Sequence, residues 1–323
     1  MESIVMQIIP RCRKNINSHA KLAVVENVKE VIVKLGFPEC IKVADLGCSC
    51  GENTFLAMSE IKCFVSGVPG SFYSRLFPSK SLHFVHSSLS LHWLSKVPDG
   101  LEENKTNVYL RSPCPPNVYN SYLTQFKNGF SLFLRMRAEE TMPDGRMVLT
   151  LVGRKALDPL SKDCFQNWSL ISHSLLDLVS EGIVKESDVE SFNLPFYNPD
   201  ENEVREVVEN EGSFKINNFE TVFGLLFSYK TGRTEVKDDD NVDQSCLLEV
   251  VRKRAKTIRS ITEPMLAAHF GSAIMDRLFD KYTYHLAQPQ RYDTLRNKPT
   301  VNFFLSLIRK KHASELMLSS NLY

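Results

Sequence analysis

The sequence lacks a long apolar run, a strong net charge and the pattern of a secretory leader. No stretch approaches the roughly 18 uninterrupted apolar residues of a membrane-spanning helix. Lys and Arg number 39 against 38 Asp and Glu, so the net charge is +1 and no strong overall attraction to nucleic acid or anionic membrane is expected. The basic residues Arg11, Arg13 and Lys14 follow the first apolar stretch, whereas in a signal peptide they precede it. We therefore expect a cytoplasmic protein that binds neither nucleic acid nor membranes.

The chain also has too few glycines, prolines and paired cysteines to belong to several structural classes. The 14 glycines and 15 prolines among 323 residues are too few for a fibrous or low-complexity chain. The eight cysteines are expected to be free thiols, because the chain is long and shows no secretory leader. Cys48 and Cys50 lie two residues apart, but no second pair and no nearby histidine completes a zinc site.

Strand-like and helix-like segments alternate along the chain. Strands are predicted at 41–46, 82–86, 146–152 and 300–309, with a β-rich stretch at 214–229. Helices are predicted at 21–36, from about 53 onward, at 117–140, 164–182 and 201–210, and at 244–281 with a break near Gly271. This alternation predicts an α/β sheet with helices on both faces.

The most distinctive local pattern is VADLGCSCGENTF at 43–55. A short strand delivers Asp45 at its carboxyl end, and Gly47 and Gly51 allow a tight turn and close approach to a ligand. Asn53 then opens a helix whose free N–H groups face the crevice at the end of the sheet.

Three interpretations of this pattern remain open on the residues alone. In the first, the glycines serve only the geometry of a strand–turn–helix. A dinucleotide-binding loop would need G-x-G-x-x-G, and here Gly47 and Gly51 are separated by three residues with no third glycine. A loop of the D-x-G-x-x-x-G type would suit S-adenosylmethionine, which has no pyrophosphate and whose ammonium group Asp45 could bind.

Longer sequence motifs narrow the class of protein to which the chain can belong. They are CFVSGVPGSFYSRLFPSK at 63–80, SLHFVHSSLSLHWLSKVPDGLEENK at 81–105, GRMVLTLVGR at 145–154, ESFNLPFY at 190–197, EGSF at 211–214 and EPMLAAHFGSAIMDRLFDKY at 263–282. Together they closely resemble the plant SABATH carboxyl methyltransferases, the group of salicylic acid, benzoic acid and theobromine methylating enzymes. The resemblance extends from about residue 17 to residue 311.

The resemblance implies a class I methyltransferase fold, a Rossmann-like α/β sheet with a mainly helical cap. Such an enzyme binds S-adenosylmethionine at the carboxyl ends of the strands, methylates the carboxylate of a small organic acid to a methyl ester, and in many members forms a homodimer. Because the helices after residue 164 are too many for one crossover, we expect them to cap the sheet. The expected division is core at 17–160, cap at 161–212, and at 213–323 the rest of the core, with a further cap segment at 244–282 and the terminal strand at 300–309.

Carried over residue by residue, the resemblance implies a set of cofactor contacts. They are Asp45, Gly47, Cys48 and Asn53 at the methionine end, Ser71 and Phe72 at the adenine, and the turn Ser87, Ser88 and Leu89 between cofactor and acid. Phe72 would offer a stacking face; without the motif, a core aromatic would be the simpler interpretation. Leu89 stands where related enzymes often have an aromatic residue, which implies a different pocket shape.

The resemblance also implies acid-binding and metal-binding residues. The acid contacts are Lys21, His92, Trp93, Trp168, Tyr197 and Ile258, with the Trp93 indole N–H donating to a carboxylate oxygen. Trp168 could equally be a packing residue. A magnesium site found in some members matches Asn104, Glu190, the carbonyl of Phe192, and Asn193, whose oxygens suit a hard cation; a hydrogen-bonded loop is the alternative. No acid or base residue is expected, because a carboxylate is already ionised at pH 7 and catalysis would consist of positioning and exclusion of water.

Two departures from the family pattern bear on activity. At the N-terminus, Lys14 and Lys21 stand where the family has a Tyr and a Gln. Between Ile61 and Cys63 the chain lacks a segment that in the family supplies a strand and the acidic residue for the cofactor ribose. We therefore expect a sheet lacking one strand. The chain is either an active carboxyl methyltransferase with a weakened cofactor site, or a catalytically impaired paralogue or isoform that retains at most acid binding or dimerisation.

Overall fold

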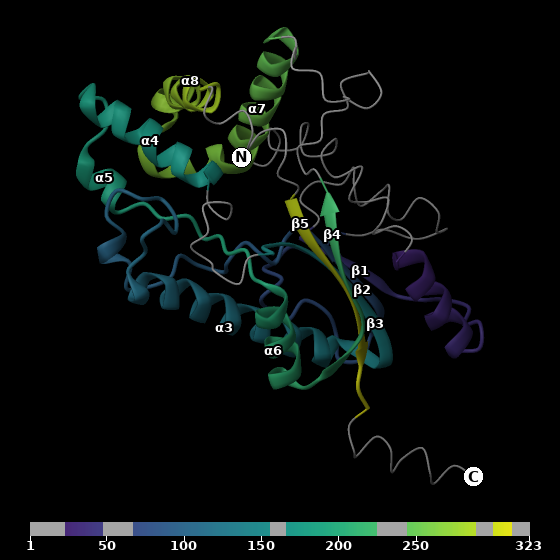
Figure 1. Cartoon of the computed structure of the whole chain (residues 1–323). Helices are drawn as coiled ribbons and strands as arrows, with labels where there is room; N and C mark the ends of the chain where they lie inside the picture. Colours follow the sequence, from purple (N-terminus) through teal and green to yellow (C-terminus); the bar gives the residue numbers. More distant parts are fainter. Residues whose placement is uncertain (1–22, 48–66, 156–165, 225–243, 289–299, 312–323) are drawn as a thin grey trace.

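The computed structural model describes residues 23–47, 67–155, 166–224, 244–288 and 300–311. Within these residues a sheet of five strands has the order β1-β2-β3-β5-β4 (Figure 1). The strands are β1 Val43–Leu46, β2 Leu82–Ser88, β3 Thr141–Gly153, β4 Phe214–Gly224 and β5 Thr300–Arg309. β1, β2 and β3 are parallel, whereas β5 runs antiparallel to both of its neighbours. The predicted α/β sheet is confirmed.

β1 lies at one edge of the sheet in the part of the chain that the structure describes. It pairs only with β2 there, with Asp45 opposite His86 and Leu46 opposite Ser87. The carboxyl ends of β1 and β2 therefore meet at the same end of the sheet, where ligands bind in open α/β folds. Residues 61–63, where the missing segment is expected, lie outside the described residues, so the lack of a strand beside β1 stays a prediction.

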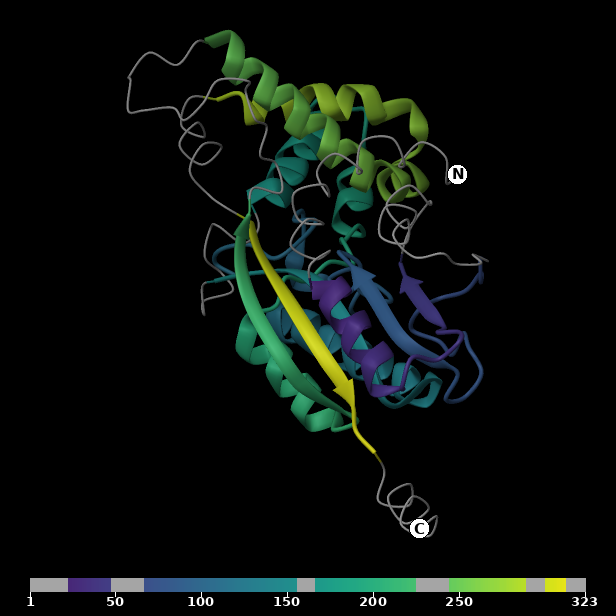
Figure 2. The same cartoon turned by 90° about the vertical axis from the view of Figure 1, so that its right-hand side faces the viewer.

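Helices cover both faces of the sheet. α3 (Pro116–Glu140) and α6 (Glu201–Glu211) lie on one face, and the helix at 23–34 lies on the other (Figure 2). α3 begins with a proline at its first position, where a missing N–H costs nothing. α6 begins with a capping box between Asp200 and Glu203 and ends at Gly212, which has a φ of 82°.

The alternation of side chains divides the core between these two faces. Phe84 of β2 packs with Val28 and Val148 beneath the helix at 23–34, whereas Val85 belongs to the larger cluster around α3. Because side chains alternate along a strand, His86 lies on the same face as Phe84. The carboxyl-end pair of Asp45 and His86 is thus on the side of the helix at 23–34.

The helical cap is built from two distant segments of the chain. It contains α4 (Gln166–Ser180), α5 (Glu186–Glu190), α7 (Gln244–Phe270) and α8 (Met275–Leu286), grouped beyond one end of the sheet (Figure 1). The predicted break near Gly271 is confirmed, since α7 ends at Phe270 and Gly271 has a φ of 86°. α6, inside the expected cap range 161–212, lies beside α3 instead, and Lys127 Nζ is 2.8 Å from both carboxylate oxygens of Glu206.

Candidate active site

A buried acid–imidazole pair closes the carboxyl ends of β1 and β2. Asp45 Oδ1 lies 2.8 Å from His86 Nδ1, and both side chains are less than a tenth exposed. An ionised carboxylate only accepts hydrogen bonds, so Nδ1 carries the proton. His86 Nε2 is buried without a hydrogen-bond partner in the described residues. Through its Nδ1, His86 of the neighbouring strand β2 thus orients the Asp45 carboxylate.

Gly47 directly follows β1 and lies against Ser90 and the ring of Phe72. Its φ is 67°, and a Cβ added there would lie 2.3 Å from Ser90 Oγ and 3.5 Å from Phe72 Cε1. The Ser90 hydroxyl donates to the Gly47 carbonyl at 3.0 Å. The position therefore requires glycine both for its backbone and for its space. Cys48 and Asn53, the other predicted residues of this loop, lie outside the described residues.

The loop that carries Ser71 and Phe72 is held by a buried ion pair on α3. Arg137 Nε lies 2.8 Å from Glu140 Oε2, and both side chains are fully buried. The Arg137 guanidinium donates to the carbonyls of Phe72 (2.9 Å) and Ser74 (2.7 Å). Glu140 Oε1 accepts from two backbone N–H groups, at 2.5 Å and 2.9 Å, of Leu76 and Phe77. Burial lowers the pKa of Arg137, an effect that Glu140 opposes.

Ser71 is exposed, and Phe72 is half-buried in an aromatic environment. The Phe72 ring lies 4.7 Å from that of Tyr73 and 6.2 Å from that of Phe133, centroid to centroid. One residue of the predicted pair is thus open to a ligand, and the other is seated against α3.

The predicted turn at 87–89 begins later than expected, because Ser87 and Ser88 still belong to β2 and only Leu89 lies beyond it. The three residues have different roles in the structure. The Ser87 hydroxyl donates to the Leu46 carbonyl at 3.1 Å and ties β2 to β1. Ser88 Oγ is buried without a partner among the described residues. Leu89 has a φ of 56° and packs against Phe304. The left-handed backbone at Leu89 turns the chain from the strand towards His92 and Trp93.

His92 and Trp93 lie side by side at the end of this turn. His92 is buried, and its Nδ1 accepts from the Val152 N–H at 3.3 Å, so the ring proton is on Nε2. Trp93 is half-buried, and its carbonyl accepts from the Tyr73 hydroxyl at 2.7 Å. Among the described residues, the Trp93 indole N–H makes no hydrogen bond, so it is available to a ligand.

Phe196 forms the centre of an aromatic cluster around Trp93, and it was missed from the sequence. Its ring centroid lies 4.9–5.5 Å from those of Trp168, Trp93, His92 and Tyr109. Phe196 also forms an isolated antiparallel bridge with Trp93. Phe196 lies within the ESFNLPFY string directly before Tyr197, so its aromatic character was the only available signal.

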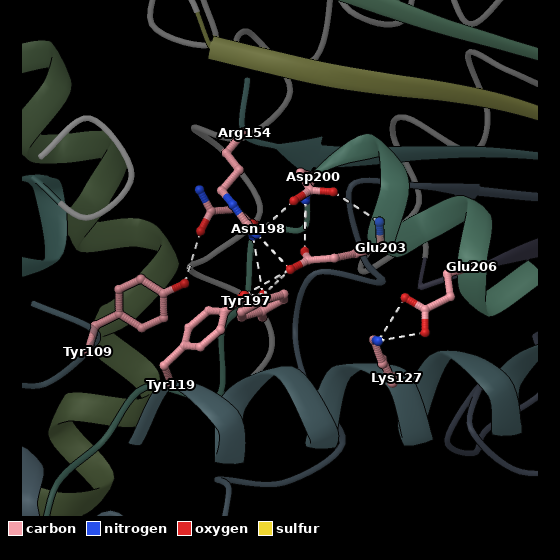
Figure 3. A network of polar contacts seen from close by, with 9 residues as sticks. All are labelled: Tyr109, Tyr119, Lys127, Arg154, Tyr197, Asn198, Asp200, Glu203 and Glu206. Atoms are coloured by element: carbon pink, nitrogen blue, oxygen red, sulfur yellow. Dashed lines mark hydrogen bonds and ion pairs between the residues drawn. The ribbon is translucent and has the colours of Figure 1, made fainter. Parts of the chain in front are cut away.

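Tyr197 and Ile258 are buried in the core. The Tyr197 hydroxyl contacts Arg154 Nη1 at 3.2 Å and donates to Glu203 Oε1 at 2.9 Å (Figure 3). Burial raises the pKa of Tyr197. Ile258, on α7, is 1% exposed. The structure brings His92, Trp93 and Trp168 together. It turns the Tyr197 hydroxyl away from them, towards Arg154 and Glu203. Lys21 lies outside the described residues.

The Arg154 network joins the end of β3 to the segment that carries Phe196. Arg154 Nη2 lies 3.1 Å from Asp200 Oδ2 and 2.6 Å from Glu203 Oε1. Its Nη1 donates to the Asn198 carbonyl at 2.6 Å. Figure 3 shows these contacts converging from β3, the segment before α6, and α6 itself. Such a buried, multiply bonded guanidinium fixes the position of the segment.

The predicted metal residues divide into a buried and an exposed group. Asn104 is fully buried, and its Nδ2 donates to Asn193 Oδ1 (2.7 Å) and to the Asn107 carbonyl (2.7 Å). Asn104 Oδ1 has no partner in the described part of the chain. Phe192 is buried and packs against Phe270, while Glu190 is exposed at the end of α5. The structure therefore brings Asn104 and Asn193 together in a hydrogen-bonded loop.

Comparison with known proteins identifies the family. The family model described as SAM dependent carboxyl methyltransferase matches residues 10–62 and 59–310. The chain belongs to the SAM-dependent carboxyl methyltransferase family. The methyltransferase is 43% identical to the salicylate/benzoate carboxyl methyltransferase of Arabidopsis thaliana, over 93% of this chain and 88% of the relative. It is 36% identical to the salicylate carboxymethyltransferase of Clarkia breweri, over 84% and 85%.

A solved structure supports the same fold for the methyltransferase. Loganic acid methyltransferase with SAH superposes with a TM-score of 0.79 at 29% identity, covering 93% of this chain and 94% of that chain. The class I methyltransferase fold predicted from the motifs is thereby confirmed.

The comparisons also locate the shortfall inside the methyltransferase chain. The match to the Arabidopsis relative extends over 351 aligned positions, whereas 93% of 323 residues is about 300, so about 50 aligned positions have no residue of this chain. The family model matches as two stretches that meet at 59–62. This is where the sequence predicted a missing segment, between Ile61 and Cys63.

None of the helices in the described part of the chain is both long and apolar enough to pass through a membrane. Within the same residues, no group of three or more His, Cys, Asp or Glu side chains is placed to hold a metal ion.

Proposed function

We propose that this methyltransferase moves a methyl group from S-adenosylmethionine to the carboxylate of a small aromatic or related organic acid, giving a methyl ester. The observation that carries the proposal is the placement of Trp93. Its half-buried indole lies in an aromatic cluster and is joined through its carbonyl to the loop of Ser71 and Phe72. The similarity to a salicylate/benzoate carboxyl methyltransferase and to a salicylate carboxymethyltransferase supports this substrate class.

The described residues fit the methyl donor on chemical grounds. Asp45 offers a carboxylate, held by His86, for the ammonium group. Phe72 offers a half-buried aromatic face beside Gly47 for the adenine. The buried, unpartnered Ser88 Oγ offers a further polar contact. We assign the same binding role to Ser71, Ser87 and Leu89, and to Cys48 and Asn53, in line with the motif.

The protein's part in the reaction is positioning. When bound, S-adenosylmethionine supplies a methyl group on a sulfonium, which is already a good leaving group. Trp93 would hold one carboxylate oxygen by its indole N–H, and His92 would set the tilt of the acid. Phe196 and Trp168 would exclude water, and Ile258, Tyr197 and Lys21 would complete the walls as the resemblance implies. Because the acid is ionised at pH 7, no side chain needs to accept a proton.

A second candidate function rests on the shortened chain. The alignment with the Arabidopsis relative leaves about 50 positions without a residue of this chain, and the family model matches as two stretches that overlap at 59–62. β1 is an edge strand in the described sheet. By resemblance, that segment supplies the acidic residue for the cofactor ribose. The alternative is therefore an impaired relative that keeps acid binding or dimerisation.

Calorimetric titration of the folded chain with S-adenosylhomocysteine separates the two functions. The proposed enzyme binds it and, with labelled S-adenosylmethionine, forms methyl salicylate or methyl benzoate. A cooperatively melting sample that shows no binding and no ester overturns the active function in favour of the impaired relative.

Magnesium fits the described residues poorly. Asn193 Oδ1 already accepts from Asn104, and the one carboxylate of the set, Glu190, is exposed. Among the described residues, Asn104 Oδ1 is the one buried side-chain oxygen of the set without a partner. This oxygen and the Phe192 carbonyl are both neutral, so they give little compensation for dehydrating Mg²⁺, which dehydrates reluctantly. We therefore favour the hydrogen-bonded loop, and no step of the reaction passes through a metal.

We further propose that the enzyme acts in the cytoplasm as a homodimer. The dimer rests on the resemblance to the family. Light scattering of the purified chain and imaging of a C-terminal fluorescent fusion test the two statements.

A further inference from the structure

Tyr73 links the two halves of the proposed site by one hydrogen bond. Its hydroxyl donates to the Trp93 carbonyl at 2.7 Å, between residues twenty positions apart. Tyr73 directly follows Phe72, the predicted adenine contact, and Trp93 is the predicted carboxylate donor. Burial raises the pKa of the Tyr73 hydroxyl well above its usual range, so the proton that it donates is retained throughout the working pH range.

The cofactor side of this link is rigid. The buried Arg137–Glu140 pair binds the backbone of the loop on both sides of Tyr73. A Cβ at Gly129 of α3 would lie 3.4 Å from Tyr73 Cε1, so the ring is seated on the bare backbone of the helix. A movement of Phe72 on binding of adenine would therefore reach the Tyr73 hydroxyl, because the loop has little freedom to absorb it.

The acid side of the link is also held in place. The Trp93 N–H donates to the Ser90 carbonyl at 3.0 Å, and Ser90 Oγ donates to Gly47. Trp93 also forms the bridge with Phe196. A shift of the Trp93 backbone thus moves the indole within the aromatic cluster where the acid would bind.

We propose that Tyr73 is a positioning residue that couples the cofactor site to the acid site, so that an occupied adenine site strengthens binding of the carboxylic acid. The inference rests on the proposed function, since it needs both ligands to bind this chain. Tyr73 touches neither ligand in this scheme and acts through Phe72 and Trp93.

The test measures the coupling directly. Salicylate is titrated calorimetrically into the full chain, with and without saturating S-adenosylhomocysteine. In the wild type, saturating S-adenosylhomocysteine is expected to tighten salicylate binding at least about five-fold, the lower end of common coupling factors. In Tyr73→Phe this factor is expected to fall to within about two-fold of unity, because one net hydrogen bond corresponds to a few-fold change in an equilibrium constant. The affinity for S-adenosylhomocysteine alone is expected to stay near the wild-type value.

Tyr122→Phe is the matched control. Tyr122 also donates from a buried hydroxyl to a backbone carbonyl, that of Leu194 at 3.1 Å, but it joins α3 to the Phe196 segment and not to the cofactor loop. Its loss is expected to lower the melting temperature and leave the coupling factor unchanged. A purely structural Tyr73 would behave like Tyr122.

Three outcomes of these titrations would overturn the coupling role of Tyr73. A normal coupling factor in Tyr73→Phe overturns the inference alone. An absence of coupling in the wild type overturns it as well, without any variant having to fold. A wild-type chain that melts cooperatively but binds neither ligand overturns the proposed function, and the inference falls with it.

Discussion

At the residue scale, the assigned role of Trp93 turns on one indole N–H. Trp93→Phe keeps an aromatic ring in the cluster but removes the donor to the carboxylate. A hydrogen bond to a charged group contributes about 1.5–3 kcal/mol, so kcat/KM for the acid should fall roughly 10- to 100-fold. Steady-state kinetics with salicylate and benzoate measure this effect.

A control variant and a control titration accompany this prediction. Trp168→Phe loses ring area in the same cluster but no proposed donor, and kcat/KM should change less than in Trp93→Phe. Titration with S-adenosylhomocysteine should give the same affinity in both variants and the wild type. Abolished cofactor affinity in Trp93→Phe would contradict the assignment of Trp93 to the acid.

Gly47 and Gly36 form a natural pair for separating backbone strain from crowding. Their φ angles are 67° and 68°, but only a Cβ at Gly47 meets atoms of Ser90 and Phe72, whereas nothing lies within 4 Å of one at Gly36. Gly36→Ala should cost about 1–2 kcal/mol from the left-handed backbone alone. Gly47→Ala should cost at least about 1 kcal/mol more, because Ser90 must move. Chemical denaturation of both variants measures the difference, and equal costs would mean that Ser90 yields freely.

The residue scale also shows where sequence reasoning reaches its limit. The motifs led to His92, Trp93 and Trp168, which the structure does bring together. They did not indicate that Phe196 faces this cluster while Tyr197 faces Arg154. Neighbouring residues in an irregular segment have no fixed period, so only the tertiary contacts decide which of two adjacent aromatic rings faces a site.

At the scale of the elements, the contact between α3 and the 71–77 loop depends on a buried charge pair. Glu140→Gln removes the charge opposite Arg137, which stays fully buried. Leaving one partner of a buried pair uncompensated typically costs about 3–5 kcal/mol. A large drop in the free energy of unfolding, measured by urea titration, is expected together with weaker binding of S-adenosylhomocysteine.

Glu206→Gln is the matched control for this change. The Lys127–Glu206 pair also joins α3 to a second element at 2.8 Å, but its side chains are 32% and 51% exposed. An exposed pair of this kind contributes about 0–1 kcal/mol. Similar losses in the two variants would show that burial of the Arg137–Glu140 pair has no special weight.

Most elements could be predicted from the sequence, and the exceptions have physical causes. The long helix expected at 117–140 is α3 at 116–140, because seven turns of apolar periodicity leave little ambiguity. β3 begins at Thr141 and not at 146, although its start contains Pro143 and Asp144, which favour turns. Pairing with Leu82 of β2 overrides that local preference. α5 has five residues, too few to show a helical period.

At the scale of the whole molecule, the shortened chain makes a prediction about the ribose of the cofactor. If no acidic residue holds the ribose hydroxyls, removing them from the ligand should cost little. A 2′,3′-dideoxy analogue of S-adenosylhomocysteine should bind within about three-fold of the parent, because no charged hydrogen bond is lost. Competition calorimetry measures the ratio. A loss above about ten-fold would instead mean that another group of this chain binds the ribose.

The position of β5 has a consequence for synthesis of the chain. β5 is the last of the described strands in chain order, yet it lies between β3 and β4. Until residues 300–309 have left the ribosome, β3 and β4 have no strand between them, and the nascent sheet keeps two open edges. A transcript truncated before residue 300 would therefore yield two unjoined parts of a sheet, which are expected to aggregate or be degraded. The sheet can therefore close only after residue 309 has been synthesised.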